Sequence, residues 1–406
     1  MLLKKKKLAA ILTALMALNI GSANVSAKNI EVNTTASSIK ERVAQIINEN
    51  PNTKKKNTAP LSTKTMHLWP VTSKDEGGTL LFSDSPEYVD KSGILYQDAV
   101  SGEARVLYYH LNNTNQPKKV AVVLENMGAN TANVRITRGG ASKPSSDYLE
   151  VGKATQLAYF GKAMNDGFML EAGENRLLRA DMDTTILQPG ELVYGVYDFY
   201  SSENVKVSVV MYPDRVNPLT YVKRAPILPK DEYRLRGTFP GMNRIFTAEK
   251  AYNPDHDGTV YFPIGDNVHD TYRTGIDATD GSKVENYGNY GILYMLDLPT
   301  AGKSHVKYYL NPLGGVYAGA MTVRHGRRMS LLPTPEGRTY FGENTATEEP
   351  CVQKAREMGI AILNEDAELS DLGTYPSGHT TTFEYSPPGA SNLPVNIIMT
   401  ADKKNK

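Results

Sequence analysis

The sequence predicts an all-β protein that consists of two β-sandwich units in tandem. From residue 67 onward, short apolar or alternating runs are separated by clusters of Gly, Pro, Asn and Asp, which is typical of a β-sandwich. In the run 193–199 successive residues alternate in character, so one set of side chains faces a core and the other faces outward. The tetrapeptide Gly-Ile-Leu-Tyr occurs at 93–96 and again at 291–294, which favours duplication of one unit.

The first unit is expected over 67–212 and the second over 241–402, joined by a proline-rich connector over 213–240. In the first unit, strands are expected at 79–82, 93–96, 105–111, 119–125, 132–137, 154–160, 192–200 and 205–212. In the second, they are expected at 259–263, 291–298, 306–310, 318–324, 328–332, 380–385 and 395–400. A tight hairpin turn is predicted at 325–327, and a short helix near 348–363 that ends at about Gly359.

The segment 1–27 has the layout of a secretory signal peptide. Four lysines are followed by the apolar run 8–18 and by small residues up to Ala27, where cleavage is expected. An uncleaved anchor is the alternative, but the apolar run is shorter than the roughly 20 residues that cross a bilayer. Residues 28–66 are expected to form an amphipathic helix over 38–47 and a flexible polar tether. We therefore expect a secreted or envelope-associated protein with no transmembrane segment after cleavage.

Charge and cysteine content narrow the class of protein further. Charged residues make up 22% of the chain and the formal net charge is +1, so no field is strong enough to indicate a nucleic-acid partner. The single Cys351 cannot form an intramolecular disulfide, so the fold must be held by its core. Cys351 is expected to be a buried thiol, with a link between chains as the alternative.

Familiar catalytic patterns are absent from the sequence. It contains no Gly-x-Ser-x-Gly, phosphate loop, His-Glu-x-x-His or Cys-x-x-Cys. Its seven histidines are scattered singly, which favours surface or strand histidines over metal ligands. A carboxylate pair for hydrolysis has too many candidates to choose from, and these include Asp255, Asp257, Asp266, Asp277 and Glu285.

One stretch matches half of a calcium loop. Asn253, Asp255 and Asp257 place oxygen side chains at alternate positions before Gly258, as in the first half of such a loop. The twelfth position is Ile264 where a Glu is expected, so a β-turn rich in Asn, Pro, Asp and Gly is the alternative. No other cofactor is expected.

Two tyrosine pairs are candidates for binding. Tyr108 and Tyr109 follow the first Gly-Ile-Leu-Tyr, and Tyr308 and Tyr309 follow the second. On a strand, one ring of each pair points inward and its neighbour outward, where it would stack on a sugar or another protein. Because aromatic residues also favour strands in general, we prefer to interpret both pairs as parts of central core strands.

The chain resembles a family of uncharacterised exported proteins from Gram-positive-type bacteria. The likeness is carried by 81–87, 93–96, 109–114, 120–123, 147–149, 152–153, 236–240, 288–291 and 311–315, and spans nearly all of residues 80–400. In that family the region often accompanies a stalk module named after the N-terminal domain of copper amine oxidases, which is not seen here. The resemblance implies an extracellular or wall-associated role and assigns no catalytic residue. Oxidase activity is not expected, because the chain has no His-x-His and no Asn-Tyr-Asp/Glu.

The sequence therefore favours a secreted, non-enzymatic cell-envelope protein that binds or scaffolds envelope material. Its partner would be cell-wall glycan or another envelope protein. The alternative is a cell-wall polysaccharide hydrolase with a carboxylate pair in a cleft between the two units.

Overall fold

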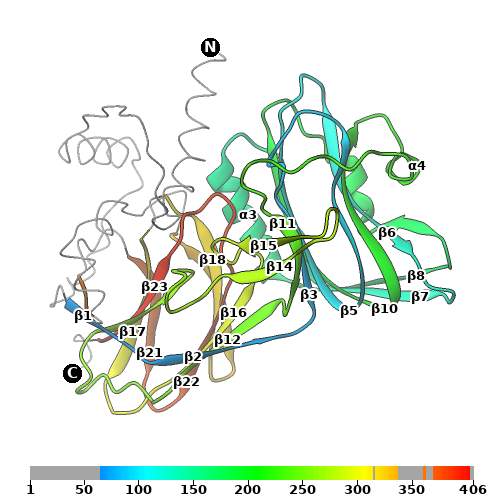
Figure 1. The fold of residues 1–406 in the computed structure, drawn as a ribbon. Coiled ribbons are helices and arrows are strands. Elements are labelled where there is room, and N and C mark those ends of the chain that lie inside the picture. The colour runs from blue at the N-terminus through cyan, green and yellow to red at the C-terminus, as the bar shows by residue number, and fades with distance from the viewer. Residues whose placement is uncertain (1–64, 314–315, 337–359, 363–368, 403–406) are drawn as a thin grey trace, which may run out of the picture. The chain divides into compact units, whose positions relative to one another are not determined.

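Strands account for 55% of the structure and helices for 8%, which confirms the all-β prediction. The structure is a computed structural model that describes residues 65–313, 316–336, 360–362 and 369–402. Its strands form one 11-stranded sheet and two six-stranded sheets (Figure 1). The predicted signal peptide, the helix over 38–47, Cys351 and the helix near Gly359 lie outside the described residues.

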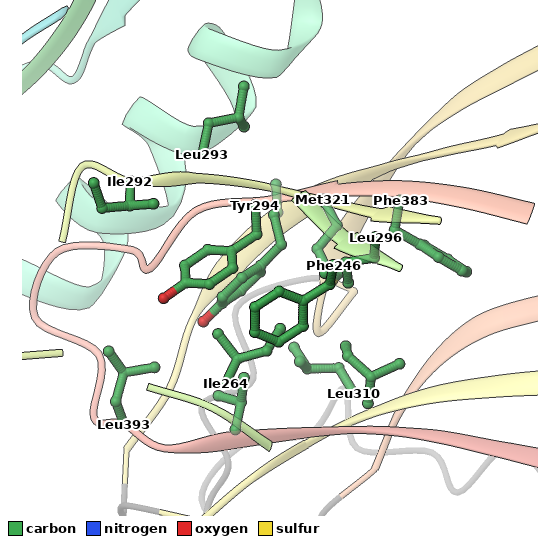
Figure 2. Packing of buried hydrophobic residues seen from close by; sticks show 14 of the residues in the cluster. Phe246, Ile264, Ile292, Leu293, Tyr294, Leu296, Leu310, Met321, Phe383 and Leu393 are labelled. Carbon is green, nitrogen blue, oxygen red and sulfur yellow. The ribbon is translucent and has the colours of Figure 1, made fainter. Parts of the chain in front are cut away.

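The two six-stranded sheets share one core and form a β-sandwich. The ring centroid of Phe246 in one sheet lies 6.1 Å from that of Phe262 in the other. Across the same interface, the ring centroids of Tyr308 and Phe383 are 5.2 Å apart. Figure 2 shows this core around Phe246 and Tyr294. In sheet order, the first contains β20 (Ile360–Ile362), β1 (Thr65–Leu68), β13 (Val260–Ile264), β23 (Val395–Ala401), β17 (His305–Pro312) and β21 (Ser370–Pro376). The second contains β19 (Arg328–Thr334), β18 (Gly319–His325), β22 (Thr380–Tyr385), β16 (Leu293–Pro299), β12 (Asn243–Ala248) and β2 (Val71–Glu76).

The 11-stranded sheet is organised by its two longest strands, β5 and β10, which pair along most of their length (Figure 1). The predicted strands 93–96 and 105–111 are one continuous strand, and so are 192–200 and 205–212. The members of this sheet are β15 (Ser282–Asn286), β14 (Arg273–Asp277), β11 (Arg236–Pro240), β3 (Thr79–Ser83), β5 (Gly93–Asn112), β10 (Leu192–Pro213), β6 (Lys118–Asn126), β9 (Asn175–Leu177), β4 (Tyr88–Val89), β7 (Ala132–Ala141) and β8 (Ala163–Leu170).

The predicted strand at 154–160 is wrong, because this segment belongs to helix α3 (Tyr148–Gly161). Asp147 caps the helix by accepting a hydrogen bond from the amide of Glu150 at 3.2 Å. Val151, Thr155 and Tyr159 recur every four residues and are buried on one helical face. The remaining helical elements of the described chain are the 3₁₀-helix η1 (Ala180–Thr184) and the short α4 (Pro218–Tyr221).

Strands from the first predicted unit pair with strands from the connector and from the second unit. β2 pairs with β12, and β1 pairs with β13, so strands from the start of the first predicted unit complete the sandwich of the second. In the reverse direction, β11 pairs with β3 and extends the 11-stranded sheet through β14 to β15. The unit boundaries themselves stay a prediction.

The two copies of Gly-Ile-Leu-Tyr occupy different structural settings. The first copy and the Tyr-Tyr segment that follows it belong to the single strand β5, whereas the second copy leads into β16 and its Tyr-Tyr segment lies in β17 of another sheet. Gly291 has a φ of +80°, and a Cβ there would lie 3.0 Å from both Leu80 and Leu107. The repeated segments are therefore similar in sequence, but the first lies in one strand and the second is divided between two strands of different sheets.

A buried ion pair joins the 11-stranded sheet to the sandwich. The Arg105 side chain is 1% exposed and donates to both carboxylate oxygens of Asp198, at 2.6 and 2.8 Å. The same guanidinium donates to the carbonyl oxygens of Met242 at 2.6 Å and Gly291 at 3.0 Å. The hydroxyl of Tyr159 completes the network by donating to Asp198 at 2.9 Å. The buried guanidinium of Arg105 is thus paired with a carboxylate of the 11-stranded sheet and with carbonyl oxygens of the segments that lead into the sandwich.

Candidate functional site

The loop between β3 and β4, residues 84–87, is fixed against two neighbouring segments. Both flanking strands pair in parallel with β5, through Ser83 opposite Tyr108 and Tyr88 opposite Leu111. The backbone of Asp84 donates to the carbonyl of Leu235 at 3.0 Å. The loop therefore lies next to residues 231–235, far away in sequence.

Asp231 clamps the two segments together. Its Oδ1 accepts hydrogen bonds from the hydroxyl of Ser85 at 2.8 Å and from the amides of Tyr233 and Arg234 at 3.1 Å each. Its Oδ2 accepts from the amide of Glu87 at 2.9 Å. Four donors converge on one carboxylate, so both of its oxygens are occupied by the protein.

The buried side chain of His110 forms hydrogen bonds with Ser83 and Pro86, at the start of the loop and within it. His110 Nδ1 lies 2.9 Å from the carbonyl oxygen of Pro86, which only accepts, so Nδ1 carries the proton. His110 Nε2 then accepts from the hydroxyl of Ser83 at 2.8 Å. Burial lowers the pKa of His110 to about 4, so the ring is neutral at neutral pH. Because Ser83 and His110 are both fully buried, this pair positions the loop and offers no accessible nucleophile.

Asp84 and Glu87 hold carboxyl groups with raised pKa values. Burial and, second, the charge of Asp231 raise the pKa of Glu87 to about 7. Burial, followed by the charges of Glu87 and Asp231, raises the pKa of Asp84 well above its ordinary value. The Oδ1 atom of Asp84 is inaccessible to solvent and has no hydrogen-bond partner. With a pKa of about 7, Glu87 is partly protonated near neutral pH and its protonated form donates a hydrogen bond, while burial favours the neutral form of Asp84.

Glu87 opens onto a surface pocket that is walled by tyrosines and acids. The pocket has a volume of about 310 Å³ and is lined by Glu87, Tyr88, Asp231, Glu232 and Tyr233. Its volume falls at the lower end of the range for small-molecule sites, roughly 300 to 1,000 Å³. We call these five residues the carboxyl pocket.

Further tyrosines surround the same acids from other elements. Burial, with smaller effects of Tyr88 and Glu87, raises the pKa of Tyr148 to about 12. Burial and then the charge of Asp84 raise the pKa of Tyr290. Both rings are partly buried, one at the start of α3 and the other in the loop after β15. The acids therefore lie among tyrosines from four separate parts of the chain, at residues 88, 148, 233 and 290.

This arrangement suits a ligand rich in hydroxyl groups. Carboxyl groups and phenols donate and accept hydrogen bonds, and phenol rings offer apolar faces to the C–H groups of a sugar ring. The lining of the carboxyl pocket contains no Lys, Arg or His, so it offers no cation to pair with a phosphate.

The predicted calcium-loop residues use their oxygens within the protein. Asn253 Oδ1 accepts from the amide of Asp255 at 3.0 Å, and Asp257 Oδ2 accepts from the amide of Asn253 at 2.7 Å. Asp255 Oδ2 accepts from the amide of Lys303 at 2.7 Å. No group of three or more His, Cys, Asp or Glu residues with metal-binding geometry occurs among the described residues. Calcium binding at Asn253, Asp255 and Asp257 stays a prediction.

The predicted tyrosine pairs are packed into the fold. Tyr108 and Tyr109 are 2% and 7% exposed, and their rings join different core clusters on opposite faces of β5. Tyr308 and Tyr309 are 0% and 4% exposed. The two rings of the first pair point to opposite faces of β5, and other elements cover both faces. A binding role for these four rings stays a prediction.

The carboxylates named from the sequence have other partners. Asp277 forms a buried ion pair with Arg236 at 2.9 Å, and Asp266 accepts hydrogen bonds from the amides of its own loop. The acids that the fold does gather, Asp84, Glu87 and Asp231, were missed. The one available signal was the turn Ser83-Asp84-Ser85-Pro86-Glu87 at a strand end, because loops at strand ends often carry function.

Comparisons with known proteins add no assignment. No protein-family model and no curated protein matches the chain. Among solved structures, it is similar to vicilin from Solanum lycopersicum (tomato) at 10% identity and a TM-score of 0.10, over 80% of this chain and 86% of that chain. It is also similar to an 11S globulin from Wrightia tinctoria at 10% identity and a TM-score of 0.11, over 83% and 84%. TM-scores this low carry no argument about fold or function.

Within the described ranges, none of the helices combines the length and apolar character needed to cross a membrane.

Proposed function

We propose that this chain is a secreted cell-envelope protein whose carboxyl pocket binds a saccharide of the cell-wall glycan. The observation that carries the proposal is the pocket itself, whose lining combines Glu87 with Tyr88 and Tyr233. Secretion rests on the signal-peptide layout of residues 1–27, and the envelope context rests on the resemblance described above.

A polysaccharide hydrolase is the second candidate, because one pocket acid has the pKa that a general acid needs. Glu87, with a pKa of about 7, would protonate a leaving group near neutral pH. Hydrolysis also requires an ionised carboxylate that is free to act as base or nucleophile. Asp231 does not meet this requirement, since four protein donors occupy its oxygens. Asp231 is therefore disfavoured as the second catalytic carboxylate, which leaves the exposed Glu232 as the other acid of the pocket lining for that role.

The test measures sedimentation of the purified chain with isolated cell walls, and released reducing sugars in the same samples. We expect retention without sugar release, and roughly fivefold weaker retention for Tyr233→Ala, because one stacked ring contributes on the order of 1 kcal/mol. Tyr200→Ala, at an exposed tyrosine of β10 outside the pocket lining, is the matched control and should bind normally. Absence of retention would refute wall binding, and sugar release that disappears in Glu87→Gln would favour the hydrolase.

A further inference from the structure

Two turns meet at one end of the sandwich, on strands other than those that carry the carboxyl pocket. The first is the hairpin turn between β18 and β19, and the second connects β21 of one six-stranded sheet to β22 of the other. The ring of His325 at the first turn stacks on Tyr375 at 5.2 Å and lies 5.9 Å from the ring of His379 at the second. His325 Nδ1 is also 3.0 Å from the hydroxyl of Thr381. These contacts hold the two turns side by side.

Three exposed arginines project from this end of the sandwich. Arg324, Arg327 and Arg328 lie in or beside the first turn, and none of them forms an ion pair with a carboxylate of the described chain. We call Arg324, His325, Arg327, Arg328 and His379 the basic tip.

Two carboxylates on strands β21 and β16 of the sandwich each have a partner other than the arginines of the basic tip. Asp371 pairs with Lys307 at 3.3 Å, and Asp297 accepts from the hydroxyl of Thr382, the residue opposite Arg324. The contrast with the interior is clear, because Arg105, Arg236 and Arg244 are each bonded to an aspartate. The positive charge of the basic tip is therefore left available for a partner outside the described chain.

We propose that the basic tip binds an anionic polymer that carries phosphodiester groups. Guanidinium groups bind phosphate oxygens through two parallel hydrogen bonds, and an Arg keeps its charge at every physiological pH. A polymer fits better than a small anion, because the exposed arginines are spread over the ends of two paired strands and the turn between them. Affinity would then come from several weak contacts made together, and it would fall as salt rises.

The experiment measures binding of a fluorescently labelled linear poly(glycerol phosphate) to the full chain by anisotropy, at low and at high salt. The test variant is the double substitution Arg327→Gln and Arg328→Gln, and the control is Arg135→Gln with Arg215→Gln. The control removes two exposed arginines outside the basic tip and changes the net charge equally. Each basic residue near a polyanion contributes about fivefold, so the test variant should bind roughly 25-fold more weakly while the control binds as the native chain does.

The outcomes separate this proposal from the carboxyl-pocket proposal. Equal binding by the test variant and the native chain would overturn it, as would equal losses in test and control variants, which would show dependence on net charge alone. Equal affinity for polyglutamate would overturn the preference for phosphate. Tyr233→Ala should bind poly(glycerol phosphate) normally and lose wall glycan, so either site can fail without the other.

Discussion

Replacement of Glu87 by glutamine should make the free energy of unfolding less dependent on pH. In the native chain the pKa of Glu87 rises from 4.5 to about 7 on folding. The folded state therefore holds a proton that the unfolded state releases between these pH values, and stability falls as pH rises through that window. The size of the shift corresponds to at most about 3 kcal/mol, since one pKa unit is about 1.4 kcal/mol.

Urea unfolding of the native chain and of Glu87→Gln at pH 4 and at pH 8 measures this effect. At pH 4 both side chains are neutral in either state, whereas at pH 8 only the native chain must bury a charge beside Asp231. The stability difference should shift in favour of the variant by up to about 3 kcal/mol between the two pH values.

Protonation of His110 changes the free energy of unfolding with pH in the opposite direction, and this contribution cancels from the difference between the native chain and Glu87→Gln. Its pKa falls from 6.5 to about 4 on folding, so its contribution to stability is lost as pH falls through that range, in both chains alike. Glu232→Gln is the control, because Glu232 lines the same pocket and its side chain is exposed. A stability difference for Glu87→Gln that stays constant within about 0.5 kcal/mol from pH 4 to pH 8 would refute the reasoning.

Three further predictions concern the scaffold. Asp198→Ala should destabilise the fold by about 3–5 kcal/mol, because it leaves the buried Arg105 without its counterion. Replacement of both Arg105 and Asp198 by Met should destabilise it less. Urea unfolding tests this order, and a lower midpoint for the double variant than for Asp198→Ala would contradict the role of the ion pair. Asp147→Ala should cost about 1 kcal/mol through loss of the α3 cap, whereas Asp147→Asn should cost less, as thermal unfolding can show. Calcium should raise the melting temperature relative to chelator if Asn253, Asp255 and Asp257 bind it, and equal values would remove that site.

The sequence predicted local strand character well because alternation and turn residues act over a few positions. Strand β18, the turn at 325–327 and strand β19 were all predicted, and their pairing places His325 opposite Arg328. The predicted strand at 154–160 is wrong because an apolar run of that length fits a strand or a helix equally. Asp147 and Glu150, at capping-box spacing, mark the start of the helix that forms instead.

The candidate site was beyond sequence reasoning for a different physical reason. Ser85 and Asp231, whose hydrogen bond closes the site, are 146 positions apart, and no local pattern links them. The raised pKa of Glu87 is likewise a property of burial, which depends on the whole fold. The sequence could indicate that carboxylates were numerous, but only the pairing of β3 with β11 selects the ones that meet.

The pairing of β2 with β12 has a consequence for the order of assembly. Thr72 bonds to Thr247, 175 positions further along, so β2 has no partner until most of the chain is present. Closing loops of this length is slow, and unpaired strand edges attract other chains in the meantime. In a chain that emerges from its N-terminus, the edges of β1 and β2 therefore stay unpaired until β13 and β12 have been made.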